Sequence, residues 1–442
     1  MMRDLFLTDR FFWCCGAFSL AFVLGFALPW SFLPVIATGI LFLLLIVLDA
    51  WWLFAHVLPV DCARRLPGVA GNGDENLVTL ELLNRSRSIL SCSLIEELPV
   101  QLQERDFEKK IVLPPGEKIQ ITYTFRPTHR GKFLFGGSIL FLSTRLGLLQ
   151  RRLRVNTGPR EVRVLPSVLQ MKKMELKALN RISTHSGIKK IRRIGHGYEF
   201  EQIKSYVPGD DYRSLNWKAS SRKAELMVNK YEDERAQQLY CLIDKSRVMH
   251  MPFNGLSLME YAINATLAIS NVALKKYDKA GLITFSDVLG SAVKADSKPL
   301  QLQLLLNQLY REAERPAEAN YELLYFAARK LITGRSLILL FTNFESTYAL
   351  ERALPILRKI NRFHLLVAIV FENSEIAGLA EDEARTLEDI YVQSAAQKYL
   401  MEKKQVVQKL HQFGIQTIYT KPEELSVNAI NKYLELKSRG LI

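Results

Sequence analysis

The sequence predicts two transmembrane helices, then a β-sandwich-like domain, then an α/β domain built on a doubly wound, Rossmann-like sheet. Three patterns support this fold class: two apolar stretches near the amino terminus, a middle region that alternates with period two, and a final region in which apolar strands alternate with helical segments. The 442 residues provide enough chain for two or three domains. The expected boundaries are 1–59 for the helical hairpin, 60–167 for the β domain, 168–235 for a linker with a motif, and 236–442 for the α/β domain.

The two apolar stretches have the length of membrane spans. Residues 11–28 carry no charge, and at about 1.5 Å per residue a helix of roughly 18 residues just crosses a hydrocarbon core of ~30 Å. Residues 32–58 carry one charge, Asp49, which we expect at the membrane interface or against a partner helix. A cleaved signal peptide is the alternative for the first stretch, but no small-x-small site is evident near its end.

Cationic residues predict the orientation of this hairpin. Arg3 and Arg10 precede the first stretch, Arg64 and Arg65 follow the second, and the connecting turn has no Lys or Arg. The positive-inside rule then places both ends, and the soluble domains, on the cytoplasmic side of the inner membrane. The net charge of +14 suits an anionic neighbour such as a membrane surface, nucleic acid or an acidic protein. Five cysteines without metal-site spacing predict cytoplasmic thiols rather than disulfides or a zinc site.

The middle region reads as short strands. "LVTLELLNRSR", "SCSLIEE", "IQITYTFRP", "GKFLFGGSILFLS" and "EVRVLP" are rich in β-branched and aromatic residues and are separated by Pro, Gly and Asn. Several such strands at this spacing indicate an antiparallel sandwich. No nucleophile motif occurs in them, and we expect the domain to act as a spacer or a binding module.

The final region predicts a parallel sheet covered on both faces. Apolar strands such as "QQLYCLID", "SLILLFTN" and "FHLLVAIVF" alternate with helical segments. Ligands of such sheets bind at the carboxyl ends of the strands. Asp244 ends the first strand and Asn343 ends a later one, so we expect a site near these residues.

The stretch "LIDKSRVM" resembles the start of a von Willebrand factor type A domain, whose metal-ion-dependent adhesion site begins D-x-S-x-S. Asp244 and Ser246 match, but Val248 replaces the second serine, the loop "EANYELL" lacks the family's threonine, and Asn343 stands where the later aspartate is expected. Mg²⁺ prefers near-octahedral oxygen ligation. The resemblance therefore implies a degenerate, unoccupied metal site, with at most weak Mg²⁺ binding and no other cofactor. Lys245 and Arg247 are the expected countercharges of Asp244.

The stretch "EFEQIKSYVPGDDYRSLNWKASSR" resembles the signature of the domain-of-unknown-function-58 family, which places it ahead of a type A domain. Many members also have two amino-terminal spans and a β-rich region, so the resemblance covers nearly the whole chain. One departure is "STRLGLL", where residues 143–146 replace the usual aspartate-proline pair. The matching residues, which are also the candidate partner-binding residues, are Glu199, Phe200, Tyr206, Gly209, Asp210, Asp211, Arg213, Trp217, Lys218 and Arg222.

Two interpretations fit this signature. In the first it is a structural joint: an aspartate caps the turn after Pro208, Trp217 is a buried apolar anchor, and the cations Arg213, Lys218 and Arg222 are countercharges. In the second, Asp210 and Asp211 perform general acid–base chemistry. Adjacent residues rarely aim both side chains at one atom, and the nearby cations would keep both carboxylates ionised. We favour the joint, with partner binding as its further role.

These observations favour a non-enzymatic, membrane-anchored interaction or adaptor protein. The family resemblance implies a MoxR-type AAA+ ATPase as its partner, in assembling or remodelling client proteins. One alternative is a metal-dependent enzyme that uses Asp210, Asp211 and Asp244. The other is a basic binder of membrane surfaces or nucleic acid through residues 189–193, although no aromatic residues are interleaved there and nucleic acid is not expected. Phosphate-loop, zincin and nucleophile-elbow motifs are missing from the sequence.

Overall fold

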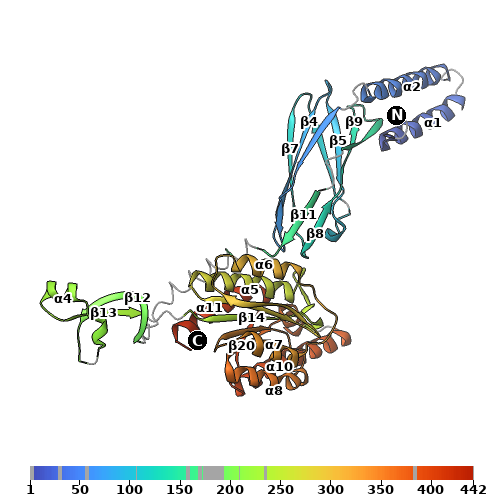
Figure 1. Cartoon of the computed structure of the whole chain (residues 1–442). Coiled ribbons are helices and arrows are strands. Elements are labelled where there is room, and N and C mark those ends of the chain that lie inside the picture. Colours follow the sequence, from blue (N-terminus) through green and yellow to red (C-terminus); the bar gives the residue numbers. More distant parts are fainter. Residues whose placement is uncertain are drawn as a thin grey trace. The chain divides into compact units, whose positions relative to one another are not determined.

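The computed structural model describes residues 4–27, 32–54, 59–105, 107–155, 160–167, 172, 194–208, 210–232, 236–381 and 386–441. It divides into two compact units, Met1–Leu165 and Pro166–Ile442, each described here by itself (Figure 1). The cationic run at 189–193, Arg3 and Gly209 lie outside the described residues, as do the side chains of Glu199 and Phe200.

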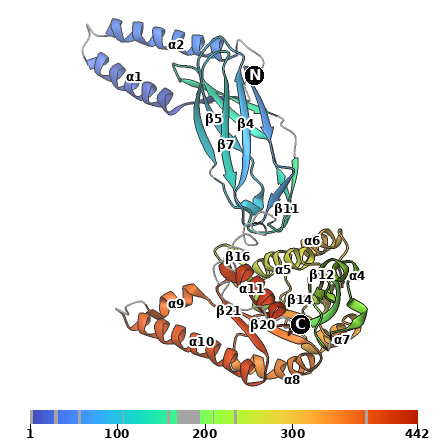
Figure 2. The ribbon, with the colours of Figure 1, turned by 90° about the vertical axis from the view of Figure 1, so that its left-hand side faces the viewer.

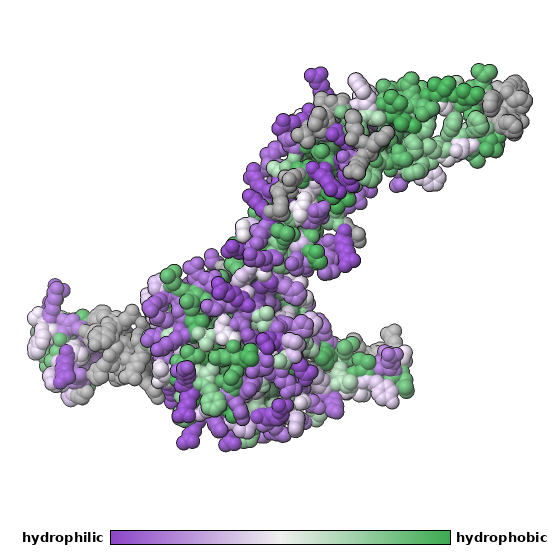
Figure 3. Space-filling view, turned by 45° about the vertical axis from the view of Figure 1, so that its right-hand side comes forward, coloured by the Kyte–Doolittle hydropathy of each residue, from purple (hydrophilic) through white to green (hydrophobic). Residues whose placement is uncertain are grey.

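Two helices begin the first unit, α1 (Asp9–Ala27) and α2 (Phe32–Phe54). They pack closely, because Gly39 has no side chain: a Cβ there would lie 2.6 Å from the ring of Phe18. Phe11 and Phe42 stack with ring centroids 6.1 Å apart. Among the described residues one helix, Leu33–Phe54, is long and apolar enough to cross a membrane. Apolar side chains dominate the surface of this hairpin (Figure 3).

The strands of the first unit form three sheets around one apolar core. The five-stranded sheet is antiparallel, in the order β1 (Leu5–Leu7), β10 (Leu149–Val155), β9 (Ser138–Ser143), β5 (Leu90–Glu96) and β6 (Glu108–Leu113). A second sheet has three strands in the order β2 (Val60–Arg65), β4 (Asn76–Asn84) and β7 (Lys118–Phe125). The third also has three strands, in the order β3 (Val69–Gly71), β11 (Arg160–Leu165) and β8 (Gly131–Phe135). Inward residues such as Leu80 and Leu140 are fully buried. The period-two pattern places them there because alternate side chains share one face of a strand.

Asp49 joins α2 to the β strands of the same unit, a contact that neither sequence-based expectation for it included. Its buried carboxylate accepts hydrogen bonds from the hydroxyl of Thr144 and from the backbone N–H groups of Leu148 at 3.1 Å and Leu149 at 3.0 Å. The three donors come from the loop "STRLGLL" and the start of β10. A second contact runs from Arg151 to the carbonyl oxygen of Leu53, at 3.2 Å. Burial of a charged side chain is tolerated here because it receives several hydrogen bonds.

The second unit contains a six-stranded sheet in the order β18, β17, β14, β19, β20, β21. Five of its strands are parallel: β14 (Gln238–Asp244), β17 (Lys279–Phe285), β19 (Leu337–Phe341), β20 (Leu365–Phe371) and β21 (Gln416–Thr420). The edge strand β18 (Leu289–Asp296) is antiparallel to β17, which the sequence analysis did not foresee. Its connection, residues 286–288, is a tight turn closed by a hydrogen bond from Ser286 to Val288, too short for a parallel crossover.

Helices cover both faces of this sheet (Figures 1 and 2). One apolar cluster joins the sheet to α5 (Leu258–Lys275), α6 (Gln301–Arg311) and α11 (Leu425–Ser438). The other joins it to α7 (Tyr321–Leu331), α8 (Thr347–Phe363) and α10 (Leu387–Gln412), and α9 (Ser374–Glu381) packs on α10. The chain leaves β14 in one direction towards β17 and later returns on its other side as β19. The carboxyl ends of β14 and β19 therefore flank the position where the strand order reverses.

The described part of the signature segment forms a hairpin. β12 (Ile194–Ser205) pairs with β13 (Met227–Glu232), and the insertion between them carries a 3₁₀ turn at Tyr212–Ser214 and α4 (Trp217–Lys223). A small two-stranded ribbon, β15 (Pro252–Phe253) and β16 (Leu256–Ser257), precedes α5.

Candidate functional site

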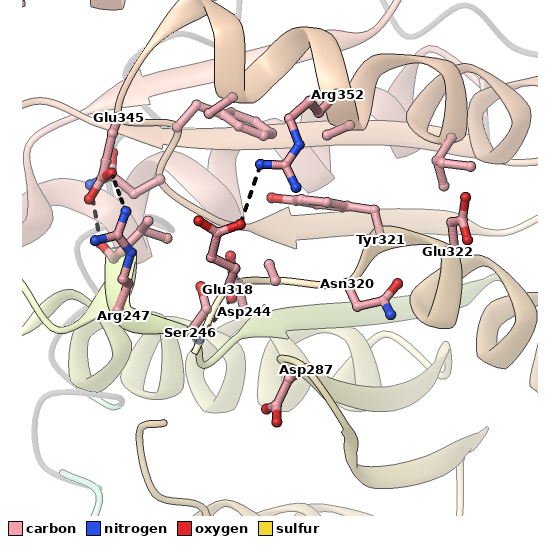
Figure 4. Close-up of a pocket in the computed structure, with 17 residues that line it drawn as sticks. Asp244, Ser246, Arg247, Asp287, Glu318, Asn320, Tyr321, Glu322, Glu345 and Arg352 are labelled. Atoms are coloured by element: carbon pink, nitrogen blue, oxygen red, sulfur yellow. Dashed lines mark hydrogen bonds and ion pairs between the residues drawn. The ribbon is translucent and has the colours of Figure 1, made fainter. Parts of the chain in front are cut away.

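A pocket of about 720 Å³ opens at the carboxyl ends of β14 and β19 (Figure 4). The loops after these strands, the segment that leads into α7, and the first turns of α8 form its walls. Its seventeen lining residues are Asp244, Ser246, Arg247, Val248, Asp287, Glu318, Ala319, Asn320, Tyr321, Glu322, Asn343, Phe344, Glu345, Ala349, Arg352, Ala353 and Ile356. The sequence analysis predicted a site near Asp244, Ser246 and Asn343, and all three residues line this pocket.

Asp244 forms the floor of this pocket and is fully buried. One carboxylate oxygen accepts a hydrogen bond from the backbone N–H of Ser246 at 2.9 Å, and the other accepts one from the hydroxyl of Thr342 at 2.8 Å. Burial raises the pKa of the Asp244 carboxyl, while the groups of Ser246 and Thr342 oppose that rise.

Tyr321 extends this hydrogen-bond chain. Its hydroxyl lies 3.0 Å from the hydroxyl of Thr342. Because Thr342 gives its own proton to Asp244, Tyr321 is the donor in the contact with Thr342. Burial raises the pKa of Tyr321 well above its usual value, and the charge of Asp244 adds to the rise, so the phenol remains protonated. The sequence analysis examined "EANYELL" for a threonine and missed the tyrosine.

Lys403 contacts the lining residue Asn343 and is almost completely buried. Its ammonium group lies 2.6 Å from the amide oxygen of Asn343 and also donates to the carbonyl oxygen of Phe344. Burial lowers the pKa of Lys403 to about 8, although Glu345 and Glu402 oppose the shift. The sequence held a signal for it, since Lys403, Val406 and Leu410 share the buried face of α10 at helical spacing.

The donor set does not fit a divalent metal ion. The amide oxygen of Asn343 faces an ammonium group, and Val248 offers no side-chain oxygen where the resemblance expects a second serine. Among the described residues, no group of three or more His, Cys, Asp or Glu side chains could hold a metal. A cation beside a ligand oxygen competes directly with Mg²⁺ for it.

The expected countercharges of Asp244 have other partners, which corrects that prediction. The ammonium group of Lys245 lies 2.8 Å from Glu312, in a buried pair, and the guanidinium group of Arg247 lies 3.3 Å from Glu345 at the surface. The charge of Asp244 is balanced by hydrogen bonds instead.

The aspartates of the signature segment have the turn-forming role that the sequence predicts. Asp210 accepts a hydrogen bond from Lys204 at 2.7 Å and another from the backbone of Val207 at 3.1 Å. The hydrogen bond from Lys204 holds the pKa of Asp210 below its usual value. Asp211 caps the next turn by accepting from the backbone of Arg213 at 3.0 Å. Neither aspartate lines the pocket of Asp244.

Trp217 is not the buried anchor that the sequence analysis expected. Its exposed fraction is 70%, and that of the neighbouring Tyr212 is 69%. The helix α4 instead packs through Ser220, which bonds to the backbone of Met227. Arg213 stacks over the ring of Tyr212 at 5.7 Å, and the countercharge of Asp210 is Lys204. The insertion therefore displays its large aromatic side chains to solvent.

The fold and this pocket define an α/β unit whose candidate site lies at the carboxyl edge of its sheet. Residues 202–391 match the sequence model of a family described as "Protein of unknown function DUF58". The chain is also 30% identical over 87 residues to the uncharacterized protein YeaD of Bacillus subtilis (strain 168), a match that covers 20% of each chain. The match thus spans a fifth of the length of that relative.

Solved structures show only distant likeness. The conserved hypothetical protein BatB from Bacteroides thetaiotaomicron is 13% identical, with a TM-score of 0.30, and the match covers 46% of this chain and 99% of BatB. A PapD-like domain of human CEP192 is 15% identical, with a TM-score of 0.19, over 25% of this chain and 87% of that domain. At these TM-scores neither structure supports a functional argument.

Proposed function

We propose that this chain is a non-enzymatic, inner-membrane-anchored interaction protein that works with a MoxR-type AAA+ ATPase in assembling or remodelling client proteins. The observation that carries the proposal is the exposure of Trp217 and Tyr212 on one short insertion, next to Arg213. Trp, Tyr and Arg dominate the energetics of protein interfaces, and here the three residue types stand together on one short exposed segment.

The insertion surface consists of the exposed apolar residues Ile203, Val207, Tyr212, Trp217 and Leu226. The exposed cations Arg213, Lys218, Arg222 and Lys223 lie among them. Exposed apolar and cationic side chains that alternate along one short segment suit a protein-binding surface. These cations favour an acidic complementary face on the partner.

The membrane anchor is a two-span hairpin in this proposal, with the soluble units in the cytoplasm. Support comes from the apolar length of Leu33–Phe54, from the packing of Phe18 against Gly39, and from the cationic flanks of the hairpin. The second unit acts as a type A-like domain. Its parallel strands and the position of Asp244 and Ser246 at the carboxyl end of β14 support that assignment.

Catalysis by the three aspartates is not favoured by their surroundings. Asp210 is held by Lys204 in a turn, and Asp244 lies in a different constellation, bonded to Thr342 and the backbone of Ser246. General acid–base chemistry needs a carboxyl group within hydrogen-bond reach of a substrate proton. These contacts favour structural roles instead.

Co-purification tests the proposal. The full chain, tagged and extracted from its own membrane in mild detergent, should recover an AAA+ ATPase, and nuclease treatment before elution should leave that recovery unchanged. Recovery of the chain alone, or with intrinsic nuclease or hydrolase activity, would contradict the adaptor function.

A further inference from the structure

The pocket above Asp244 is acidic in a chain that is basic as a whole. Its lining holds five carboxyl groups, those of Asp244, Asp287, Glu318, Glu322 and Glu345, and two guanidinium groups, those of Arg247 and Arg352. Lys403 beside Asn343 and Arg315 on Asp287 add two cations next to this lining, so the carboxylates exceed the nearby cations by one when all nine groups are ionised, whereas the chain carries +14. Clefts lined by one sign of charge concentrate ligands of the other sign.

The two guanidinium groups form only weak ion pairs with carboxylates of the pocket. Arg352 lies 3.3 Å from Glu318, and Arg247 lies 3.3 Å from Glu345, and all four side chains are exposed by more than half. Exposed ion pairs of this kind contribute little to stability. An incoming cation can therefore take over Glu318 at little cost (Figure 4).

The floor of the pocket holds an acceptor that the fold does not use. Ser246 is completely buried and lines the pocket, and its hydroxyl forms no hydrogen bond with any described residue, although it lies near enough to Asp244 to lower the pKa of that carboxyl. Buried hydroxyl groups almost always have a partner. Asp244 also has spare capacity, since a carboxylate can accept about four hydrogen bonds and Asp244 accepts two from its neighbours.

We infer that this pocket binds a guanidinium or ammonium group, presented by an Arg or Lys side chain of a protein partner. The inference rests on the proposal that the chain acts by binding proteins. Glu318 and Glu345 receive the cation at the mouth, and Ser246 and Asp244 accept its N–H groups at the floor. A volume of about 720 Å³ accommodates one long basic side chain with part of its backbone.

Calorimetric titration of the full chain in detergent micelles tests this site. The probes are the peptide acetyl-Gly-Arg-Gly-amide, the same peptide with neutral citrulline in place of arginine, free arginine, and Mg²⁺. The variants are Glu318→Gln and Ser246→Ala, neither of which removes a contact that holds the fold. Glu375→Gln, at an exposed position of α9 outside the pocket, is the matched control.

The arginine peptide should bind, and citrulline should weaken binding about tenfold or more. Glu318→Gln and Ser246→Ala should each weaken arginine-peptide binding about tenfold, and Glu375→Gln should leave it unchanged. Equal binding of both peptides, no binding, insensitivity to both variants, or displacement of the peptide by Mg²⁺ would overturn the inference. Free arginine that binds as tightly as the peptide would also overturn it, because the ligand would then be a small molecule.

The outcome is separable from that of the proposed function. The peptides are synthetic, so a failure of the pocket leaves the recovery of the ATPase unaffected. Retained peptide binding without recovery of an ATPase would count against the adaptor function alone.

Discussion

The ammonium group of Lys403 lies 2.6 Å from the amide oxygen of Asn343, a residue that lines the pocket above Asp244. Asn343 stands where the type A resemblance puts an aspartate, and its oxygen is the atom that a metal ion would need. A lysine from α10 thus supplies a positive charge from within the protein at this edge of the sheet. Removing one partner of such a buried contact leaves an unpaired polar group, which is costly.

Lys403 should make folding stability depend on alkaline pH. Its pKa is about 8 in the folded protein, against a usual value of 10.5. Between these values the unfolded state binds more protons, so the free energy of unfolding should rise with pH across this window. Chemical denaturation of the full chain and of Lys403→Met, below and within the window, measures it. The stability of the wild type relative to the variant should increase with pH, and a constant difference would contradict the assigned burial.

Divalent metal ions should leave the protein unchanged. A ligand present at 100 times its dissociation constant would stabilise the folded state by about 2.7 kcal/mol. We expect millimolar Mg²⁺ or Mn²⁺ to leave the melting temperature of the full chain unaltered, with and without Asp244→Ala, because Asn343 already faces Lys403. A rise of several degrees that Asp244→Ala abolishes would restore the metal-dependent hypothesis.

Asp49 should stabilise the first unit through the loop that it binds. Asp49→Ala leaves the N–H groups of Leu148 and Leu149 without their acceptor, at a cost of about 1–3 kcal/mol for each buried group. Thermal unfolding of the full chain should show that the variant has a clearly lower melting temperature than the wild type. Thr38→Ala, at an exposed position of the same helix, is the control and should have little effect. An equal response of the two variants would refute the role of Asp49.

The carboxy-terminal unit should lie in the cytoplasm, because Arg10, Arg64 and Arg65 flank the hairpin on one side. A reporter enzyme that is active only in the periplasm, fused after Ile442, should remain silent. The same reporter inserted in the turn between the two helices should be active. Activity of the carboxy-terminal fusion would show that the topology is wrong.

The sequence was informative where periodicity determines burial. Strand β14 is an apolar run and is buried along almost its whole length, and Asp244 lies at its carboxyl end as the pattern predicted. The strands of the first unit could also be predicted from their alternating pattern, because one face of each strand packs against the core. Asp210 and Asp211 also form the turn contacts that their residue types favour.

Contacts between residues far apart in the sequence could not be predicted. Lys403 reaches Asn343 across sixty residues of sequence, and Asp49 reaches Leu149 across a hundred. No local pattern states such pairings. The exposure of Trp217 was missed for a different reason: composition suggests burial of tryptophan, whereas the orientation of a short helix depends on which residue packs, here Ser220. Antiparallel β18 was missed because a three-residue turn, rather than a helix, connects it to β17, whereas the sequence pattern suggested strictly alternating strands and helices.

The effect of Trp217→Ala on partner binding and on stability tests the central claim most directly. Because 70% of Trp217 is exposed, the substitution leaves no cavity and the melting temperature of the full chain should not change. Loss of an interface hot spot costs about 2 kcal/mol or more, so the ATPase recovered with the variant should fall at least tenfold. Phe326→Ala, at a position 65% exposed on α7, is the control and should retain the ATPase. Unchanged recovery with Trp217→Ala, or a melting temperature several degrees lower with recovery intact, would contradict the account and restore the structural joint.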